Sequence, residues 1–173
     1  MRSIVVRLLL ASLALPALAS CATSDMAQSH PEARAYVAGR DAYADLDAGL
    51  ARAQLTGKNV LLVMGANWCH DSRALAGWLE TPRFTALLAD RYEVVYVNVG
   101  MPQTGDGHNE DIARRFGLDG ITGTPAVLVI GPDGVLRNAD TAQSWRNAAS
   151  RNEDAIFDEL ASLAAEKAYS PSR

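Results

Sequence analysis

A short apolar run sets the strongest limit on the fold of this chain. The run is "NVLLVMG", residues 59–65, and turn-forming residues bound it. An unbroken apolar run is typical of a strand that is buried on both faces, whereas a half-exposed strand alternates apolar and polar residues. The run therefore predicts a central strand in a sheet that is covered on both faces.

Helical and strand patterns alternate along the rest of the chain. Helical patterns occupy residues 35–55, residues from 72 on, residues from 82 on with Thr81 as N-cap, "EDIARRFG" with Asn109 as its cap, and residues 153–167. Strand patterns occupy residues 93–99 and 126–130, and a tight "GPDG" turn leads to a further one near 135–137. This order predicts one α/β domain with a mixed, mainly parallel sheet of about four to five strands and helices on both faces.

The N-terminal segment is typical of a signal for export. Arg2 and Arg7 precede an uncharged apolar run from Leu8 to Ala19, which is too short for a membrane span. The run ends in "LASC", which resembles a bacterial lipobox and implies cleavage before Cys21 and lipid attachment to that cysteine. A buried N-terminal helix and ordinary signal cleavage nearby are the alternatives.

We accordingly expect a signal peptide at 1–20, a lipidated tether at 21–34, the folded domain at 35–169 and a tail at 170–173. Ala22 after Cys21 resembles a signal for transfer to the outer membrane, so we expect an anchor there that faces the periplasm. The formal net charge is -4 and no long run of Lys or Arg occurs, which argues against a nucleic-acid partner. We expect no cofactor.

Cys69 lies between the buried strand and a helix. Unpaired backbone N–H groups at a helix N-terminus favour an anion, and the thiolate is the reactive form of cysteine. His70 can add positive charge beside it, whereas the carboxylate of Asp71 opposes thiolate formation. With Cys21 lipidated, Cys69 has no cysteine in the chain to pair with, although exported proteins normally form disulfides.

The segment from about Gly57 to Lys167 resembles the thioredoxin superfamily. The likeness rests on a strand, a Trp-Cys motif at a helix, a second strand, "GTP", a hairpin and a closing helix. It implies that Trp68 and Cys69 form the active-site pair and that Thr124 and a cis Pro125 form a substrate-binding loop. "GTPA" resembles the bacterial disulfide isomerases, and "GANWCHDSR" followed by "VYVNVG" is similar to small exported thioredoxin-like proteins.

Two departures from that family bear on mechanism. Ser72 stands where the second cysteine of the motif is expected, and Val63 stands where thioredoxin has a buried aspartate. A dithiol reductase leaves a mixed disulfide through attack by its second thiol, and a serine hydroxyl cannot perform that step. Ser72 can still hydrogen-bond the backbone as an ordinary helix residue.

Three functions remain open for the motif of Trp68, Cys69, His70, Asp71 and Ser72. We favour single-cysteine thiol–disulfide exchange with cell-envelope proteins that carry disulfides or thiols, either as an isomerase or through a mixed disulfide that an outside thiol resolves. The second is a binding module without catalysis, because a fold does not determine a function. The third is a metal site of Cys69, His70 and His108. We expect no metal, because adjacent Cys and His do not match the spacing of structural zinc sites. His30 is expected to be solvated in the tether.

Overall fold

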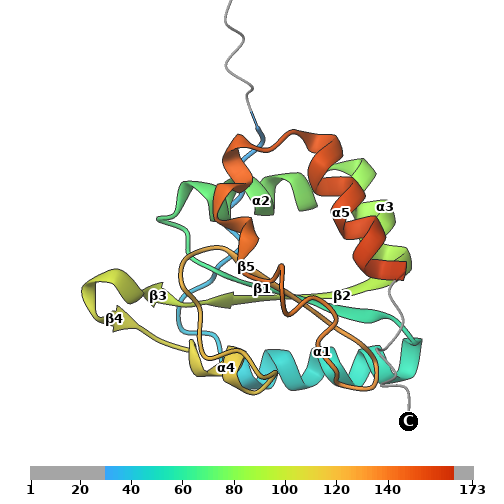
Figure 1. The fold of residues 1–173 in the computed structure, drawn as a ribbon, viewed down its shortest axis with the longest axis horizontal. Helices are drawn as coiled ribbons and strands as arrows, with labels where there is room; N and C mark the ends of the chain where they lie inside the picture. The colour runs from blue at the N-terminus through green and yellow to red at the C-terminus, as the bar shows by residue number, and fades with distance from the viewer. Residues whose placement is uncertain (1–29, 166–173) are drawn as a thin grey trace, which may run out of the picture.

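A three-stranded sheet lies at the centre of the computed structural model, which describes residues 30–165 (Figure 1). Its order is β2–β1–β5, with β1 at Asn59–Gly65, β2 at Tyr92–Asn98 and β5 at Ala126–Ile130. β1 is parallel to β2, from the Asn59–Tyr92 pair to the Gly65–Asn98 pair. β1 is antiparallel to β5, from the Val60–Ile130 pair to the Met64–Ala126 pair. The predicted signal segment, Cys21 and the predicted tail lie outside the described residues.

Helices cover both faces of this sheet (Figure 1). One face carries α2, His70–Leu79, α3, Pro82–Arg91, and α5, Glu153–Ala165. The other carries α1, Ala42–Thr56, and the short α4, Asp111–Arg114. Two 3₁₀ turns, η1 at Pro102–Thr104 and η2 at Ser144–Ser150, and a small sheet of β3, Gly100–Met101, with β4, Asp106–Gly107, complete the described fold. The predicted α/β class and its two helical layers are confirmed.

The pleat of β1 divides the core between these two layers. Leu61 and Val63 pack on the side of α2, α3 and α5, whereas Leu62 and Met64 pack on the side of α1 and α4. All seven residues of β1 are buried, as the unbroken apolar run predicts. The central strand therefore fixes the position of everything that follows its carboxyl end.

The central sheet has fewer strands than the sequence predicts. Residues 135–137 form only an isolated bridge from Leu136 to Ile130, and the sheet pairs are one parallel and one antiparallel instead of mainly parallel. The side-chain amide of Asn138 explains the lost strand. It accepts from the Val129 N–H at 2.8 Å and donates to the Val127 carbonyl at 2.9 Å, so it takes the place of a backbone peptide at the β5 edge.

Two predicted helix starts are also wrong. The first helix begins at Ala42 instead of residue 35, because the Asp41 carboxylate caps it by accepting from the N–H groups of residues 43 and 44. Gly57 ends this helix with a left-handed φ of 74°, as expected. Asn109 does not cap α4; it has a φ of 60° and donates from its side-chain amide to the Asn98 carbonyl at 2.9 Å. Between residues 30 and 165, no helix combines the length and apolar character needed to cross a membrane.

Candidate functional site

Cys69 is the N-cap residue of α2. Its backbone is extended, with φ -78° and ψ 124°, and its N–H donates to the Ala66 carbonyl at 3.1 Å. Its own carbonyl accepts from the Arg73 N–H at 3.1 Å, which starts the helix. The residue is 8% exposed. The sulfur therefore lies at the positive end of a ten-residue helix, at the carboxyl edge of β1.

The strand register brings Thr124 and Pro125 to this sulfur. Ala126 pairs with Met64 near the end of β1, so the residues just before β5 lie beside the loop that precedes α2. The Thr124–Pro125 peptide bond is cis, as the resemblance implies. The Cys69 thiol donates to the Thr124 carbonyl with Sγ and O 3.3 Å apart. Two segments more than fifty residues apart in sequence thus meet at one sulfur atom.

Ser72 lies one helical turn beyond Cys69 and is completely buried. Its hydroxyl accepts from the Ala66 N–H at 3.4 Å, and its carbonyl accepts from the Tyr36 hydroxyl at 3.4 Å. Gly65 is needed here, because a Cβ at that position would lie 2.7 Å from the Ser72 Oγ. The Ser72 hydroxyl is therefore engaged in holding the loop before Cys69.

The other residues of the motif face three different directions. Trp68 is 44% exposed, and its Nε1–H donates to the Gly100 carbonyl at 2.7 Å, which joins the motif to β3. The imidazole of His70 lies in solvent, with Nε2 3.3 Å from the Glu32 Oε1. Asp71 accepts from the Ala149 N–H at 2.8 Å and so ties α2 to η2, beyond the helix-dipole role that its position suggests.

Arg73 organises the site, a role that the sequence patterns above do not predict. Its Nη1 donates to the carbonyls of Asn67 and Trp68, each at 3.1 Å, and its Nε donates to Glu32 at 2.9 Å. This hydrogen bond lowers the pKa of the exposed Glu32 carboxyl below its ordinary value. The signal was present in "CHDSR": an arginine four residues after the N-cap lies one turn along the helix and can reach back to the preceding loop.

Asn67 and Tyr36 connect the same loop to the segment before α1. The Asn67 amide donates to the Tyr36 carbonyl at 2.8 Å and accepts from the Tyr36 N–H at 3.2 Å. Burial raises the pKa of the Tyr36 hydroxyl well above its ordinary value. Val63 is fully buried in the same core cluster, and between residues 30 and 165 no carboxylate is buried. The core beneath the motif therefore offers a neutral phenol and no acidic proton acceptor in the described chain.

The potential metal ligands that the structure brings together differ from the set considered from the sequence. In the part of the chain that is described, the group of potential ligand atoms around His70 includes His30 and Glu32 but neither Cys69 nor His108. The sequence predicts residues 30–34 as part of a tether, yet Ala33 donates from its N–H to the Arg73 carbonyl at 3.0 Å. This short segment lies against α2.

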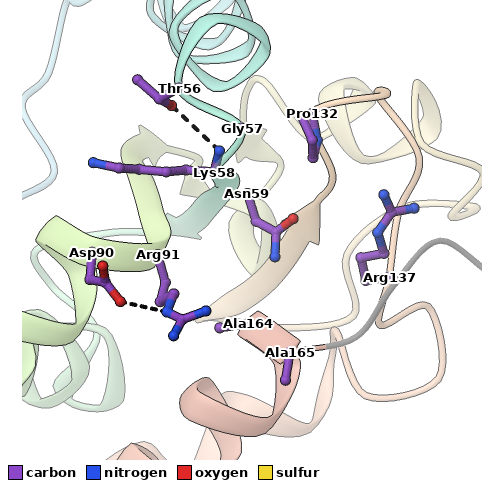
Figure 2. Close-up of a pocket in the computed structure, with 10 residues that line it drawn as sticks. All are labelled: Thr56, Gly57, Lys58, Asn59, Asp90, Arg91, Pro132, Arg137, Ala164 and Ala165. Atoms are coloured by element: carbon purple, nitrogen blue, oxygen red, sulfur yellow. Dashed lines mark hydrogen bonds and ion pairs between the residues drawn. The ribbon is translucent and has the colours of Figure 1, made fainter.

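A cavity of about 600 Å³ lies at the opposite end of β1 (Figure 2). The ends of α1, α3 and α5, the start of β1 and the loop after β5 line it, and Lys58, Arg91 and Arg137 are its basic residues. None of the residues of the motif lines this cavity. This cavity is therefore separate from the surface around Cys69.

Comparison with known proteins agrees with this geometry. The family model described as thioredoxin-like matches residues 41–132. A disulphide isomerase from Xylella fastidiosa Temecula1 has a similar solved structure, with a TM-score of 0.68, 36% identity, and coverage of 76% of this chain and 97% of that chain. Among curated proteins, none matches. The family match spans more than half of the chain and includes β1, α2 and the cis-proline loop, so this chain belongs to the thioredoxin-like family.

Proposed function

We propose that this protein carries out single-cysteine thiol–disulfide exchange through Cys69, in the manner of a disulfide isomerase or of a protein that forms mixed disulfides. The observation that carries the proposal is the position of the sulfur. It lies at the start of α2, 3.3 Å from the carbonyl of the residue before cis Pro125. Membership of the thioredoxin-like family and similarity to a disulphide isomerase support exchange of this general kind.

The first step forms one S–S bond and breaks another. The Cys69 thiolate attacks one sulfur of a substrate disulfide, a mixed disulfide forms, and the other substrate sulfur leaves as a thiolate. No electrons are gained or lost in total. In the proposed step the helix N-terminus favours the attacking anion. The Thr124 carbonyl, which accepts from the Cys69 thiol at 3.3 Å, loses that hydrogen bond when the thiol loses its proton and then accepts one from the backbone of an extended substrate.

The second step requires a thiol from outside the motif. Ser72 carries a hydroxyl in place of a thiol, so it has no sulfur with which to attack the mixed disulfide. Its side chain is also buried, and its hydroxyl accepts a hydrogen bond from the Ala66 N–H. Release then comes from another thiolate of the same substrate, which isomerises the substrate, or from a separate thiol. We infer that mixed disulfides of this protein live longer than those of a dithiol enzyme.

We further propose that the protein works in the cell envelope. The "LASC" motif supports lipid attachment at Cys21, and Ala22 supports an outer-membrane anchor that faces the periplasm. Its partners there are proteins with disulfides or thiols. Replacing Cys21 with Ser tests the anchor, because the variant should then leave the membrane fraction after a salt wash. Retention in that fraction contradicts it.

One set of variants tests the chemistry. Wild type, Cys69→Ala and Ser72→Cys are compared for turnover of a disulfide substrate such as insulin, and for covalent complexes on non-reducing gels. Exchange predicts complexes with wild type, none with Cys69→Ala, and shorter-lived complexes with faster turnover for Ser72→Cys. Val63 in place of the aspartate keeps that gain small. Covalent complexes that persist in Cys69→Ala contradict the proposal.

A second candidate is a binding module that uses the same surface without covalent chemistry. The observation in its favour is the pair of exposed apolar side chains beside the motif, Trp68 at 44% and Met101 at 41% exposure. Trp68 contacts the carbonyl of Gly100, the residue before Met101. This candidate predicts that Cys69→Ala retains full non-covalent affinity for a captured partner while Trp68→Ala loses it.

A further inference from the structure

Three metal-ligating side chains meet on the solvent side of α2, outside the thiol chemistry. They are His30 and Glu32 from the segment before α1 and His70 from the first turn of α2. Their ligand atoms all lie within 4.8 Å of one another. The two imidazole rings have centroids 4.7 Å apart, and Glu32 Oε1 lies 3.3 Å from His70 Nε2.

The segment that carries His30 and Glu32 is closely packed on the helix. Besides the bond from Ala33 to the Arg73 carbonyl, the Glu32 Oε2 accepts from Arg73 Nε at 2.9 Å. Gly77 permits this approach, because a Cβ there would lie 2.3 Å from the Pro31 carbonyl oxygen. The backbone thus holds the two ligands of the segment over His70 before any ion binds.

The spacing of the ligand atoms fits a transition metal ion. Zinc ligands lie about 2.0–2.1 Å from the ion in a tetrahedron, which places neighbouring ligand atoms roughly 3.3–3.4 Å apart. The Glu32 Oε1 to His70 Nε2 distance of 3.3 Å has that value. His30 must move closer by a small rotation, and its partly exposed position leaves room for this.

The surrounding contacts orient the ligands as outer-shell groups do in metal sites. Arg73 holds one oxygen of Glu32, so the other oxygen is directed to His70. The His30 Nδ1 lies 3.3 Å from the Pro31 carbonyl, which leaves its Nε2 as the ligand atom. Two imidazoles and one carboxylate suit zinc, copper or nickel better than calcium or magnesium.

We propose that His30, Glu32 and His70 bind one divalent transition metal ion of the zinc class, with the remaining coordination position open to solvent. The site needs no sulfur and stands apart from the exchange reaction of Cys69. By joining both segments, the bound ion fixes residues 30–32 on the first turn of α2. The proposal therefore stands or falls independently of the proposed function.

Zinc titration of the full-length protein tests the site. The protein is purified in detergent without a polyhistidine tag, and Zn²⁺ binding is measured by competition with a chromophoric chelator. We expect one ion per chain and an affinity at least about tenfold lower in each of His30→Ala, Glu32→Gln and His70→Ala, since even outer-shell changes cost that much. His108→Ala is the matched control, because it removes a histidine outside the cluster and should change nothing.

Two further measurements keep the result interpretable. Cys69→Ala should bind Zn²⁺ with unchanged affinity, whereas loss of binding in this variant assigns the ion to the thiol and overturns the proposal. Zn²⁺ should raise the melting temperature of wild type and of His108→Ala, but not of the three ligand variants, at matched concentration. Absence of binding to wild type, or binding that survives both His30→Ala and Glu32→Gln, also overturns it.

Discussion

The two faces of the central sheet are built from different side chains. The face under α2, α3 and α5 contains four fully buried or nearly buried aromatic residues, namely Tyr36, Phe84, Tyr92 and Trp145. Apart from Met64, the buried residues on the face under α1 and α4 are all aliphatic. Figure 1 shows α2 on the same side of the sheet as α3 and α5, so the motif at the start of α2 lies on the aromatic face.

The difference shows how the surface around Cys69 is supported by a core without buried charge. A tyrosine hydroxyl can donate to a buried backbone carbonyl, which an aliphatic side chain cannot do. The Tyr36 hydroxyl donates to the Ser72 carbonyl, and the Tyr92 hydroxyl donates to the Leu160 carbonyl at 2.6 Å. Val63 lies on the same face and contributes only apolar packing. The aromatic face therefore positions α2 and its preceding loop, while the aliphatic face mainly supplies buried area.

The largest expected effect on stability comes from replacing a large buried side chain with alanine on either face of the sheet. Phe84→Ala on the aromatic face should lower the free energy of unfolding by about 3–5 kcal/mol, and Leu62→Ala on the aliphatic face by about 2–5 kcal/mol. The two should differ at the site: Phe84→Ala loosens α3 and α2, so Cys69 should react faster with an alkylating agent under native conditions. Urea titration and alkylation kinetics measure the two effects. Equal acceleration by Leu62→Ala would remove the functional contrast between the faces.

Val63→Asp tests the absence of an acidic group beneath the motif. A lone buried carboxylate is costly, so this variant should lose about 3 kcal/mol or more of stability at neutral pH. Burial raises the pKa of such a carboxyl above its ordinary value, so the loss should grow as pH rises above about 3.9. Val63→Asn is the control, since its cost should not depend on pH. A pH-independent loss in Val63→Asp would mean that the new carboxylate reaches solvent.

Tyr36→Phe removes one hydroxyl from the aromatic face and keeps its volume. The lost hydrogen bond to the Ser72 carbonyl should cost about 0.5–1.5 kcal/mol. Burial, with smaller contributions from Tyr96 and Cys69, raises the pKa of Tyr36 well above its ordinary value of 10.0. Tyr36 therefore ionises at a lower pH in the unfolded chain than in the folded protein. As a result, the free energy of unfolding falls as pH rises above 10.0.

Chemical denaturation at neutral pH and at about pH 11 measures both effects of Tyr36→Phe. The variant should lose less stability than wild type over this interval, because its phenylalanine cannot ionise. Leu62→Ala serves as the control, because it should lose as much stability between the two pH values as wild type does. An identical alkaline loss in Tyr36→Phe and wild type would assign that loss to other groups, such as Tyr96, whose pKa burial also raises.

Local sequence patterns predicted the elements but not their tertiary contacts. The apolar run at residues 59–65 and the turn-formers around it located β1, because burial on both faces leaves a clear pattern. The fourth strand failed because a side chain, Asn138, replaces backbone pairing at β5, and no periodicity signals that exchange. The sequence placed Cys69 near a helix start, and the resemblance placed it against Pro125. It did not reveal Arg73 and Glu32, because their contact joins residues that are 41 positions apart.

Glu32→Gln should have the smallest effect on stability, because it removes only the exposed ion pair of Glu32 with Arg73, on the side of the sheet that carries α2. The Arg73 guanidinium, followed by smaller effects of His70 and His30, lowers the pKa of Glu32 below its ordinary value of 4.5. Its stabilising contribution is therefore present above that pH and lost as pH falls through the lowered pKa of the folded state. The carboxylate is exposed, so solvent screening should limit the change in melting temperature to about 2 °C or less at neutral pH. The difference between variant and wild type should therefore shrink as the pH falls below 4.5. Hydrogen exchange at the Ala33 amide gives a local test, because this N–H donates to the Arg73 carbonyl and should exchange faster in Glu32→Gln.

Asp45→Asn is the control for this exchange test. It breaks a comparable exposed pair with Arg40 beside the aliphatic face and should leave the exchange rate at Ala33 unchanged. If both substitutions accelerate exchange at Ala33 equally, residues 30–33 are held by the global fold and not by the Glu32–Arg73 pair.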